Sequence, residues 1–323
     1  MTTKEQVLTI LLRHHGEWQS GDQLAQSVGC SRESIWKAIN ALRKQGHQIE
    51  SRKNRGYCYL GSRNLDAKAI QIYGQRQFTG PLEVVAQTPS TQILAKSFLS
   101  HHQPQFAAFF ADGQTAGYGR LGRDFYSPAK TGLYFSLVVP NPTNALVNVG
   151  LLTTGVAVSV LNVLQQFYPN KNFGLKWVND IYLDQHKVGG IITEASLELE
   201  SISATAFIVG VGLNLTTTDF PRELQARAQA VDPSMSVDRN RLAAALLSAL
   251  VALSKRYATA DFLPAYRAKS LVLGQQVTLQ VGDSVVNGVA EDIDEHGGLV
   301  VRMLTGERRT FTSGEVIRVG LPV

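Results

Sequence analysis

The length of 323 residues exceeds what one small core usually organises, so we expect two or three domains. The hydrophobic content of 44% is ordinary for a globular chain, and no run of about eighteen apolar residues predicts a transmembrane helix. The first residues lack the pattern of a signal peptide, and Cys30 and Cys58 fit neither a disulfide framework nor a metal site. These features indicate a protein of the reducing cytoplasm without a membrane partner.

The net charge of +5 is concentrated in one part of the chain. Between residues 31 and 55, seven lysines and arginines stand against two glutamates, so the remainder is close to neutral. This asymmetry predicts a basic face on one module.

Residues 1–62 are predicted to form that module, a winged helix-turn-helix. Apolar residues at helical spacing predict a first helix near residues 4–15. Ser20 and Gln23 have the spacing of a capping box, and a third helix is expected from Ser31 to Gly46. The segment 47–61 then predicts two strands around a basic tip.

A basic helix beside a basic wing favours DNA binding through phosphates and base edges. The candidate DNA-binding residues are Arg32, Ser34, Lys37, Arg52, Lys53 and Arg55. A small docking or dimerisation module with a solvated basic face is the alternative.

Two further modules follow. In residues 65–270, strand patterns and helical stretches alternate, with hairpin turns at 178–180 and 184–186, which predicts an α+β domain around a mixed sheet. In residues 271–323, short β-rich runs between glycine-containing turns predict a five-stranded, SH3-like barrel. This last module holds no evident catalytic set.

The segment "GQTAGYGRLGR" (113–123) raises the question of which anion it binds. Gly117, Gly119 and Gly122 satisfy the spacing of a dinucleotide-binding turn, but no helix pattern follows them, so a Rossmann site is excluded. A glycine-rich loop with Arg120 and Arg123 can still bind phosphate or carboxylate. A surface loop with solvated arginines is the alternative.

Other candidates lie further along the central module. Lys187 directly precedes the apolar run "VGGII". It could face an anion in a cavity, or it could lie exposed at the end of a hairpin. The same two alternatives apply to Lys176 and Asp180. A later strand contains Gly210 and Gly212 and ends at Asn214. The long segment 216–238 suggests a lid in which Phe220 could cover a planar ring.

Three motifs in this order, behind a winged helix-turn-helix, resemble the bifunctional biotin protein ligases that also act as biotin-operon repressors: "GQTAGYGRLGRDFYSP", "KWVNDIYLDQHKVGGIITE" and "VGVGLNL". The resemblance covers essentially the whole chain. It implies a multidomain α+β protein with an N-terminal winged helix-turn-helix, a central mixed-sheet ligase domain like the class II synthetases, and a C-terminal SH3-like β-barrel.

The resemblance also implies an activity. Such a protein activates biotin with ATP and Mg²⁺ to biotinyl-5′-AMP and transfers biotin to one lysine of a biotin carboxyl carrier protein. Without acceptor, the adenylate-bound form is expected to dimerise on operator DNA and repress transcription.

Site residues carry over by motif. The resemblance assigns biotin or adenylate binding to Ser90, Thr91, Gln92, Gln114, Gly117, Tyr118, Gly119, Arg120, Lys187, Gly210, Gly212 and Asn214. It assigns catalytic roles to Arg120, Lys187, Lys176 and Asp180, with Asn179 in the same motif, and no side chains to a metal site. Phe220 is a guess for the adenine cover.

The chain departs from one common family form, G-R-G-R-R-G, because Tyr118 and Leu121 replace arginines, and Val178 stands where many relatives have proline. Two alternatives stay open. One is a lipoate-type ligase, and the other is a ligand-sensing repressor without catalysis.

Overall fold

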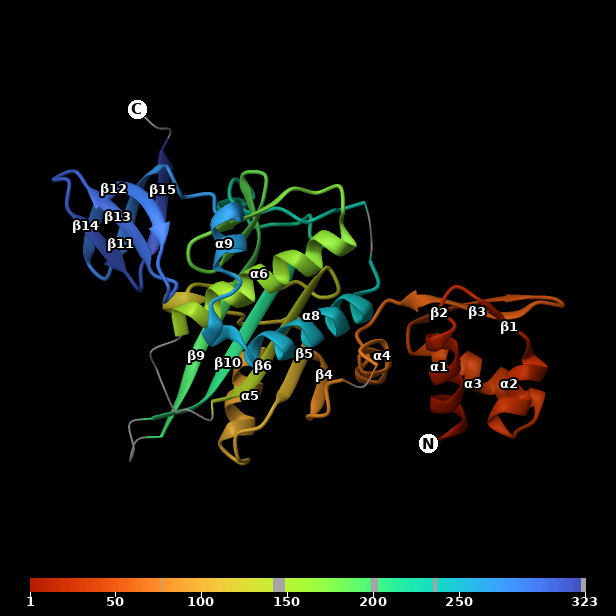
Figure 1. The fold of residues 1–323 in the computed structure, drawn as a ribbon. Coiled ribbons are helices and arrows are strands. Elements are labelled where there is room, and N and C mark those ends of the chain that lie inside the picture. The colour runs from red at the N-terminus through yellow and green to blue at the C-terminus, as the bar shows by residue number, and fades with distance from the viewer. Residues whose placement is uncertain (76, 142–148, 199–202, 235–236, 321–323) are drawn as a thin grey trace. The chain divides into compact units, whose positions relative to one another are not determined.

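The computed structural model describes residues 1–75, 77–141, 149–198, 203–234 and 237–320 (Figure 1). The chain divides into two compact units, one made of residues 1–79 and 237–248 and the other of residues 80–236 and 249–323. The first unit is discontinuous in sequence, because helix α8 (Arg239–Ser254) begins in it and ends in the second unit.

The first unit contains the predicted helix-turn-helix. Its first helices are α1 (Thr3–Arg13), α2 (Gly21–Val28) and α3 (Arg32–Lys44). Ser20 and Gln23 form the predicted capping box at α2, and Gly29 ends that helix in the left-handed conformation. The Ser31 hydroxyl accepts a hydrogen bond from the Ser34 amide and caps α3.

The wing follows the third helix. Its strands are β2 (His47–Arg52) and β3 (Gly56–Ser62), and the short strand β1 (Trp18–Gln19) pairs with the other side of β3. Helices and wing share one apolar core, whose buried members include Val7, Leu11, Leu24, Ile35, Ile39, Leu42 and Tyr59. This burial holds the three helices and the wing together as one body.

The first unit continues past the wing into helix α4 (Ala67–Tyr73), which packs on α1. The Asp66 amide donates to Asn240 Oδ1 at 2.7 Å, and Asn240 Nδ2 donates to the Asn64 carbonyl at 3.1 Å. The Tyr73 hydroxyl donates to Asp238 Oδ2 at 3.2 Å. The start of α8 is thereby tied to the chain that follows the wing.

A seven-stranded mixed sheet forms the centre of the second unit, in the order β4-β5-β6-β10-β9-β8-β7. Its strands are β4 (Leu82–Thr88), β5 (Ala107–Gln114), β6 (Gly132–Pro140), β7 (Phe173–Lys176), β8 (Asp180–Leu183), β9 (His186–Glu198) and β10 (Ser203–Asn214). The pair β4–β5 is parallel and the other described pairs are antiparallel. The two predicted hairpin turns join β7, β8 and β9.

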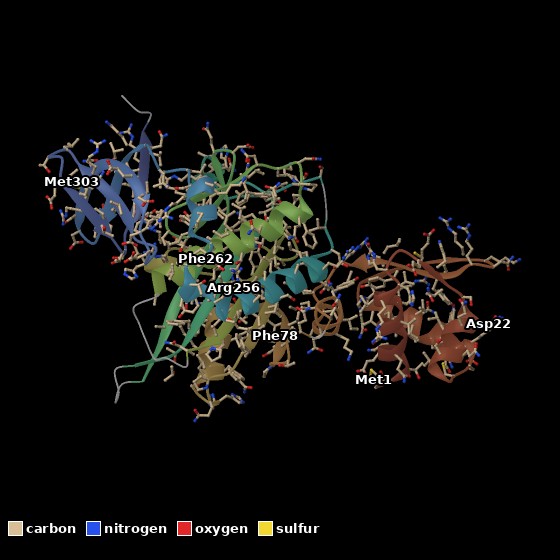
Figure 2. The ribbon with its side chains drawn as sticks, in the orientation of Figure 1. Met1, Asp22, Phe78, Arg256, Phe262 and Met303 are labelled. Atoms are coloured by element: carbon tan, nitrogen blue, oxygen red, sulfur yellow. The ribbon has the colours of Figure 1, made fainter. Side chains whose placement is uncertain are left out.

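Helices cover this sheet. Helix α5 (Thr91–Leu99) packs on β5, β6 and β10, and α6 (Val149–Phe167) packs on β7, β8, β9 and helix α9 (Leu263–Lys269). Among the described residues, α6 is long and apolar enough to cross a membrane, but 67% of it is buried inside the unit, as in a core helix. Phe262, labelled in Figure 2, packs where Gly155 of α6 carries no side chain.

The C-terminal part of the second unit is an antiparallel sheet of five strands in the order β14-β13-β12-β11-β15. These strands are β11 (Gln276–Val281), β12 (Ser284–Ile293), β13 (Leu299–Met303), β14 (Arg308–Phe311) and β15 (Glu315–Gly320). Alternate side chains form its own small core. The winged helix-turn-helix, the mixed sheet and this small antiparallel sheet confirm the predicted fold class.

Candidate functional site

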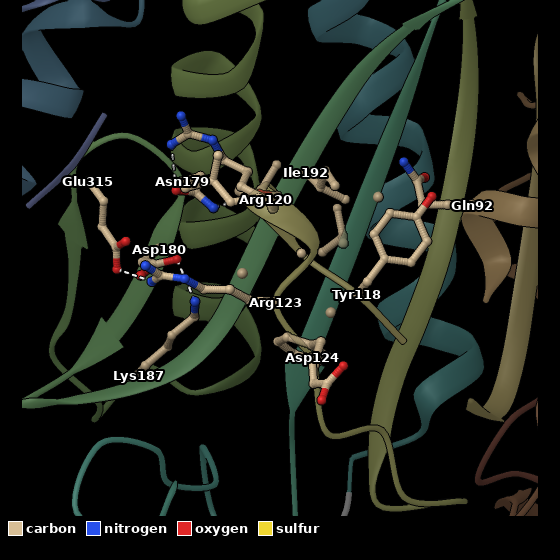
Figure 3. Close-up of a pocket in the computed structure, with 18 of the residues that line it drawn as sticks. Gln92, Tyr118, Arg120, Arg123, Asp124, Asn179, Asp180, Lys187, Ile192 and Glu315 are labelled. Carbon is tan, nitrogen blue, oxygen red and sulfur yellow. Dashed lines mark hydrogen bonds and ion pairs between the residues drawn. The ribbon is translucent and has the colours of Figure 1, made fainter. Parts of the chain in front are cut away.

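A pocket in the second unit gathers segments that lie far apart in the sequence (Figure 3). Its wall is formed by the start of α5, the end of β5, residues 118–125, the hairpins of β7–β9, the middle of β10 and residues 314–316. Many of the predicted site residues line it: Ser90, Thr91, Gln92, Gln114, Tyr118, Gly119, Arg120, Lys176, Asn179, Asp180, Lys187, Gly210 and Gly212.

The glycine-rich segment folds back on itself as a narrow loop. The Phe125 amide donates to the Gly117 carbonyl, and the Gly119 amide donates to the Arg123 carbonyl, each at 2.8 Å. Leu121 and Gly122 make the tip with positive φ. Only a 3₁₀ turn, η1 (Arg120–Gly122), and then strand β6 follow, so the structure agrees that this is no Rossmann turn.

Arg120 extends from this loop and contacts both the β7–β8 hairpin and the C-terminal sheet region of the second unit. Its Nη1 donates to the Gly314 carbonyl at 3.2 Å and to Asn179 Oδ1 at 3.4 Å. Desolvation lowers the pKa of the Arg120 guanidinium, and the nearby carboxylates of Asp180 and Glu315 oppose this shift. Guanidinium donors not used in these bonds are available to an anion.

Lys187 lies in the pocket as an ion pair and not as a solvated hairpin lysine. Its Nζ is 2.6 Å from Asp180 Oδ1, and the two side chains are 31% and 21% exposed. Desolvation lowers the pKa of neighbouring Lys176, while Asp180 and Glu315 act in the opposite direction. The hairpin therefore places two cations and one carboxylate on the pocket wall.

The opposite end of the pocket is polar and buried. The Thr91 amide donates to Gln114 Oε1 at 2.9 Å, and Gln114 Nε2 donates to Ser127 Oγ at 2.9 Å. Ser90 caps α5 by accepting from the Gln92 amide at 3.3 Å. These bonds hold the side chains of Gln114 and Ser90. Ser90, Thr91 and Gln92 are 2–3% exposed.

Two charged residues beside this end escaped the sequence analysis. Glu194 Oε1 accepts from Lys96 Nζ at 2.8 Å, and Glu194 Oε2 accepts from the Tyr118 hydroxyl at 3.1 Å. Lys96 Nζ also donates to the Tyr118 hydroxyl at 3.0 Å. The available clue was a glutamate that follows the apolar run "VGGII" within β9, because a partly buried carboxylate requires a partner.

Three predicted residues are not on the pocket wall. Gly117 lies behind it, where a Cβ would approach Gln114 Nε2 to 2.6 Å and the Phe125 carbonyl oxygen to 2.8 Å. Asn214 is 4% exposed at the end of β10. Phe220 is 8% exposed and packs on Tyr126, with ring centroids 6.1 Å apart. The roles of these residues stay predictions.

The predicted lid, residues 216–238, is partly paired with the pocket hairpin. The Lys187 amide donates to the Arg227 carbonyl, and the Gln229 amide donates to the Lys187 carbonyl. A short helix, α7 (Arg222–Gln225), precedes this pairing. Residues 235–236 of the predicted lid lie outside the described residues.

The C-terminal sheet contributes directly to the pocket. Gly314, Glu315 and Val316 line it, and Glu315 forms an ion pair with Arg123. Sequence analysis found no evident catalytic set in this module, because no chemical motif marks residues 314–316. The contribution follows from tertiary contacts between segments almost two hundred residues apart.

In the first unit, the candidate DNA-binding residues lie on α3 and the wing, and all of them are exposed except Ser34, which is half-buried. Lys37 pairs with Glu33 at 2.7 Å, Arg32 pairs with Asp22, and Arg52 pairs with Glu50 at 3.0 Å. Arg52 also stacks over the Trp18 ring at 5.1 Å. Lys53 and Arg55 lie exposed at the wing tip.

Comparison with known proteins gives matches for all three regions. Residues 3–58 match the family described as an HTH domain, residues 84–214 the Biotin/lipoate A/B protein ligase family, and residues 272–319 the Biotin protein ligase C terminal domain. The "Bifunctional ligase/repressor BirA" of Escherichia coli K12 is 28% identical over 317 residues, covering 95% of each chain.

Two further matches cover about three quarters of the chain. The "Biotin--[acetyl-CoA-carboxylase] ligase" of Mycobacterium tuberculosis is 32% identical over 269 residues, which cover 79% of this chain and 96% of that protein. The solved "Biotin protein ligase from Aquifex aeolicus in complex with biotin and ATP" is 28% identical with a TM-score of 0.61, covering 74% of this chain and 99% of that one.

The mixed sheet and its cationic pocket, together with the helix-turn-helix, define a ligase that carries a DNA-binding module. The chain belongs to the biotin protein ligase family, with the domain composition of its bifunctional ligase/repressor members.

Proposed function

We propose that this chain activates biotin with ATP to biotinyl-5′-AMP and transfers biotin to one lysine of a biotin carboxyl carrier protein. The names of its relatives, and the biotin and ATP held by a solved relative, support this activity. The observation that carries the proposal is that one pocket combines a cationic side with a polar end lined by buried side chains.

In the first step, a biotin carboxylate oxygen attacks the α-phosphorus of ATP, and the bond to pyrophosphate breaks. Both reactants are anionic, so cations must offset their repulsion. We assign this role to Arg120 and Lys187, which approach the pocket from the glycine-rich loop and from β9. Lys176 adds a third positive charge, and Asp180 holds Lys187 in place.

In the second step, the neutral ε-amine of the acceptor lysine attacks the acyl carbon, and AMP leaves. The acceptor amine is itself the nucleophile, so no covalent enzyme intermediate is required. Loop residues 117–123 would shield the mixed anhydride from water, which otherwise hydrolyses it.

Mg²⁺ would reach this site with ATP. The described residues contain no group of three or more His, Cys, Asp or Glu side chains that could hold a metal ion. We expect ATP to supply most of its ligands through phosphate oxygens, and bound there it would draw charge off the leaving pyrophosphate.

Biotin would lie with its carboxylate toward the cations and its ring system toward the polar end. Ser90, Thr91, Gln92 and Gln114 would then surround the rings, with Gly210 and Gly212 leaving room beside β10. Asn214 and Phe220 keep their predicted roles at the nucleotide end as part of this proposal.

The direct test is incubation of the protein with biotin, ATP, Mg²⁺ and a carrier domain, followed by detection of carrier-bound biotin and released pyrophosphate. We expect both products, and neither without ATP. Labelling by lipoate instead of biotin would identify a lipoate-type ligase. An unlabelled carrier despite biotin binding would identify a sensor without catalysis.

The first unit would act as a biotin-responsive operator-binding domain. We assign DNA contacts to Arg32, Ser34, Lys37, Arg52, Lys53 and Arg55, with base contacts near the start of α3 and phosphate contacts along the wing. The adenylate-bound protein would dimerise on DNA in the cytoplasm. The modules 1–62, 65–270 and 271–323 would serve DNA binding, catalysis and support of the pocket.

A gel shift tests this second role. The probe is a DNA fragment from upstream of a biotin synthesis or transport gene, and binding is measured with and without biotin plus ATP. We expect a shift that strengthens with both ligands. DNA binding that is equally strong with and without biotin plus ATP would contradict the biotin-responsive repressor role. It would not contradict the ligase activity.

A further inference from the structure

Helix α3 carries one large aromatic side chain that the fold leaves exposed. Trp36 is 56% exposed, whereas the buried side chains Ile35, Ala38, Ile39 and Leu42 occupy the other face of the helix. Trp36 is not among the side chains that pack on the core of the first unit. No hydrogen bond or ring contact joins its indole to another side chain that the structure describes. The core of this unit is therefore complete without the ring, which is available to a partner.

Two arginines flank this ring on the surface of the helix. Arg32 lies four residues before Trp36 and Arg43 lies seven residues after it, so all three fall on one side of α3. Arg32 is held by an ion pair with Asp22 of α2. The Arg43 guanidinium donates to the Ile49 carbonyl of the wing at 2.9 and 2.7 Å. The ring therefore lies between two positioned cations, on the side of α3 whose arginine contacts the wing.

The charges around the ring indicate the chemistry of its partner. A cationic face with an apolar centre complements a DNA duplex, which carries phosphates on its outside and apolar groups only within its grooves. In the major groove, the apolar group that a side chain meets on a base edge is the C5 methyl of thymine. An indole packed on such a methyl removes both apolar surfaces from water, whereas a phosphate offers it no apolar contact.

We propose that Trp36 recognises thymine in the operator by packing its indole against C5 methyl groups in the major groove. The proposal rests on the proposed DNA-binding function and names a residue that sets its sequence preference. The lysines and arginines of α3 and the wing contribute affinity for any duplex, because the phosphates are the same in every sequence. Trp36 adds discrimination between sequences, because thymine is the base that carries this methyl group.

The test replaces thymine by uracil, which removes the methyl group and keeps every hydrogen-bonding group of the base. The probe is a DNA fragment from upstream of a biotin synthesis or transport gene, prepared with thymine or with uracil throughout. Fluorescence anisotropy measures its binding to the full-length protein in the presence of biotin and ATP. We expect the wild type to bind the thymine probe about fourfold more tightly for each methyl that the indole covers. In Trp36→Ala the ratio of the two affinities should fall to about onefold.

Three further measurements separate base recognition from other roles of the ring. The slope of log affinity against log salt should be the same in the wild type and in Trp36→Ala, because no phosphate contact is lost. Trp36→Phe retains an apolar ring and should keep part of the preference for the thymine probe. Leu304→Ala removes an exposed apolar side chain of the second unit and is the matched control, which should keep the wild-type ratio.

An affinity ratio in Trp36→Ala equal to that of the wild type would overturn the inference. The same result together with loss of the dimer in sedimentation without DNA would overturn it as well, and would assign the ring to a contact between two copies of the chain. A wild type that binds neither probe would instead remove the proposed DNA-binding function, and the inference with it.

Discussion

The contact between Lys187 and Asp180 determines how the pocket receives an anion. At 2.6 Å, and with both side chains mostly buried, Asp180 neutralises the lysine in the ligand-free protein and fixes its position. An ammonium has three donors, so Lys187 can keep Asp180 and still bind a carboxylate or phosphate. The cation is therefore positioned before substrate arrives.

Lys187→Ala should weaken the binding of biotin and of its adenylate by about tenfold or more. The change removes the cation from the anion and leaves Asp180 unpaired at a partly buried site. Calorimetry with biotin and with a non-hydrolysable adenylate analogue measures both affinities, and the exposed Lys255→Ala serves as control. Affinity equal to that of the control would remove Lys187 from the site.

Arg120→Gly should produce a leaky enzyme. The loop would lose its bonds to Gly314 and Asn179 as well as a charge on the phosphate, so the adenylate would escape before transfer. We expect biotin on lysines of an unrelated protein such as serum albumin, visible by streptavidin blot. Strict selectivity for the carrier lysine would contradict this role of Arg120.

At the scale of elements, capping and turn residues made much of the fold predictable. Ser20, Gln23 and Gly29 act within one turn of helix, so their pattern is visible in the sequence. The hairpins β7–β9 were predictable for the same local reason. The cluster of Lys96 with Glu194 was not, because it joins a helix to a strand about a hundred residues away.

The wing makes a prediction at this same scale. Lys53→Ala with Arg55→Ala should weaken DNA binding on all sequences alike and lower the slope of log affinity against log salt by about two, since two phosphate contacts are lost. Fluorescence anisotropy over a range of salt concentrations measures this slope. Lys255→Ala with Arg318→Ala carries the same charge change elsewhere and should leave the slope unaltered; equal effects of the two pairs would contradict a specific wing contact.

For the whole molecule, buried tyrosines predict loss of stability in alkali. Burial raises the pKa of Tyr182 to about 12, and it also raises the pKa of Tyr59, Tyr73, Tyr168 and Tyr266. The unfolded chain releases these protons near pH 10, whereas the folded protein retains them. Their stabilising contribution is therefore complete below about pH 10 and disappears as the pH rises through the folded-state values.

Urea unfolding at a series of pH values measures this effect. We expect the unfolding midpoint to fall between about pH 10 and pH 12, and to fall less in Tyr182→Phe, which has no proton to lose there. Tyr126→Phe is the control for removing one hydroxyl. Identical pH profiles for wild type and Tyr182→Phe would contradict the assignment.

The first unit, assembled from two stretches of chain, limits how this protein can be recombined with its relatives. A graft joined after residue 62 would separate the wing from α4, and with it from the Asp66 and Tyr73 bonds to the start of α8. Exchange of the DNA-reading part would need a double crossover that moves residues 1–79 and 237–248 together. A substitution at the contacts of residues 1–79 would likewise favour a compensating substitution in residues 237–248.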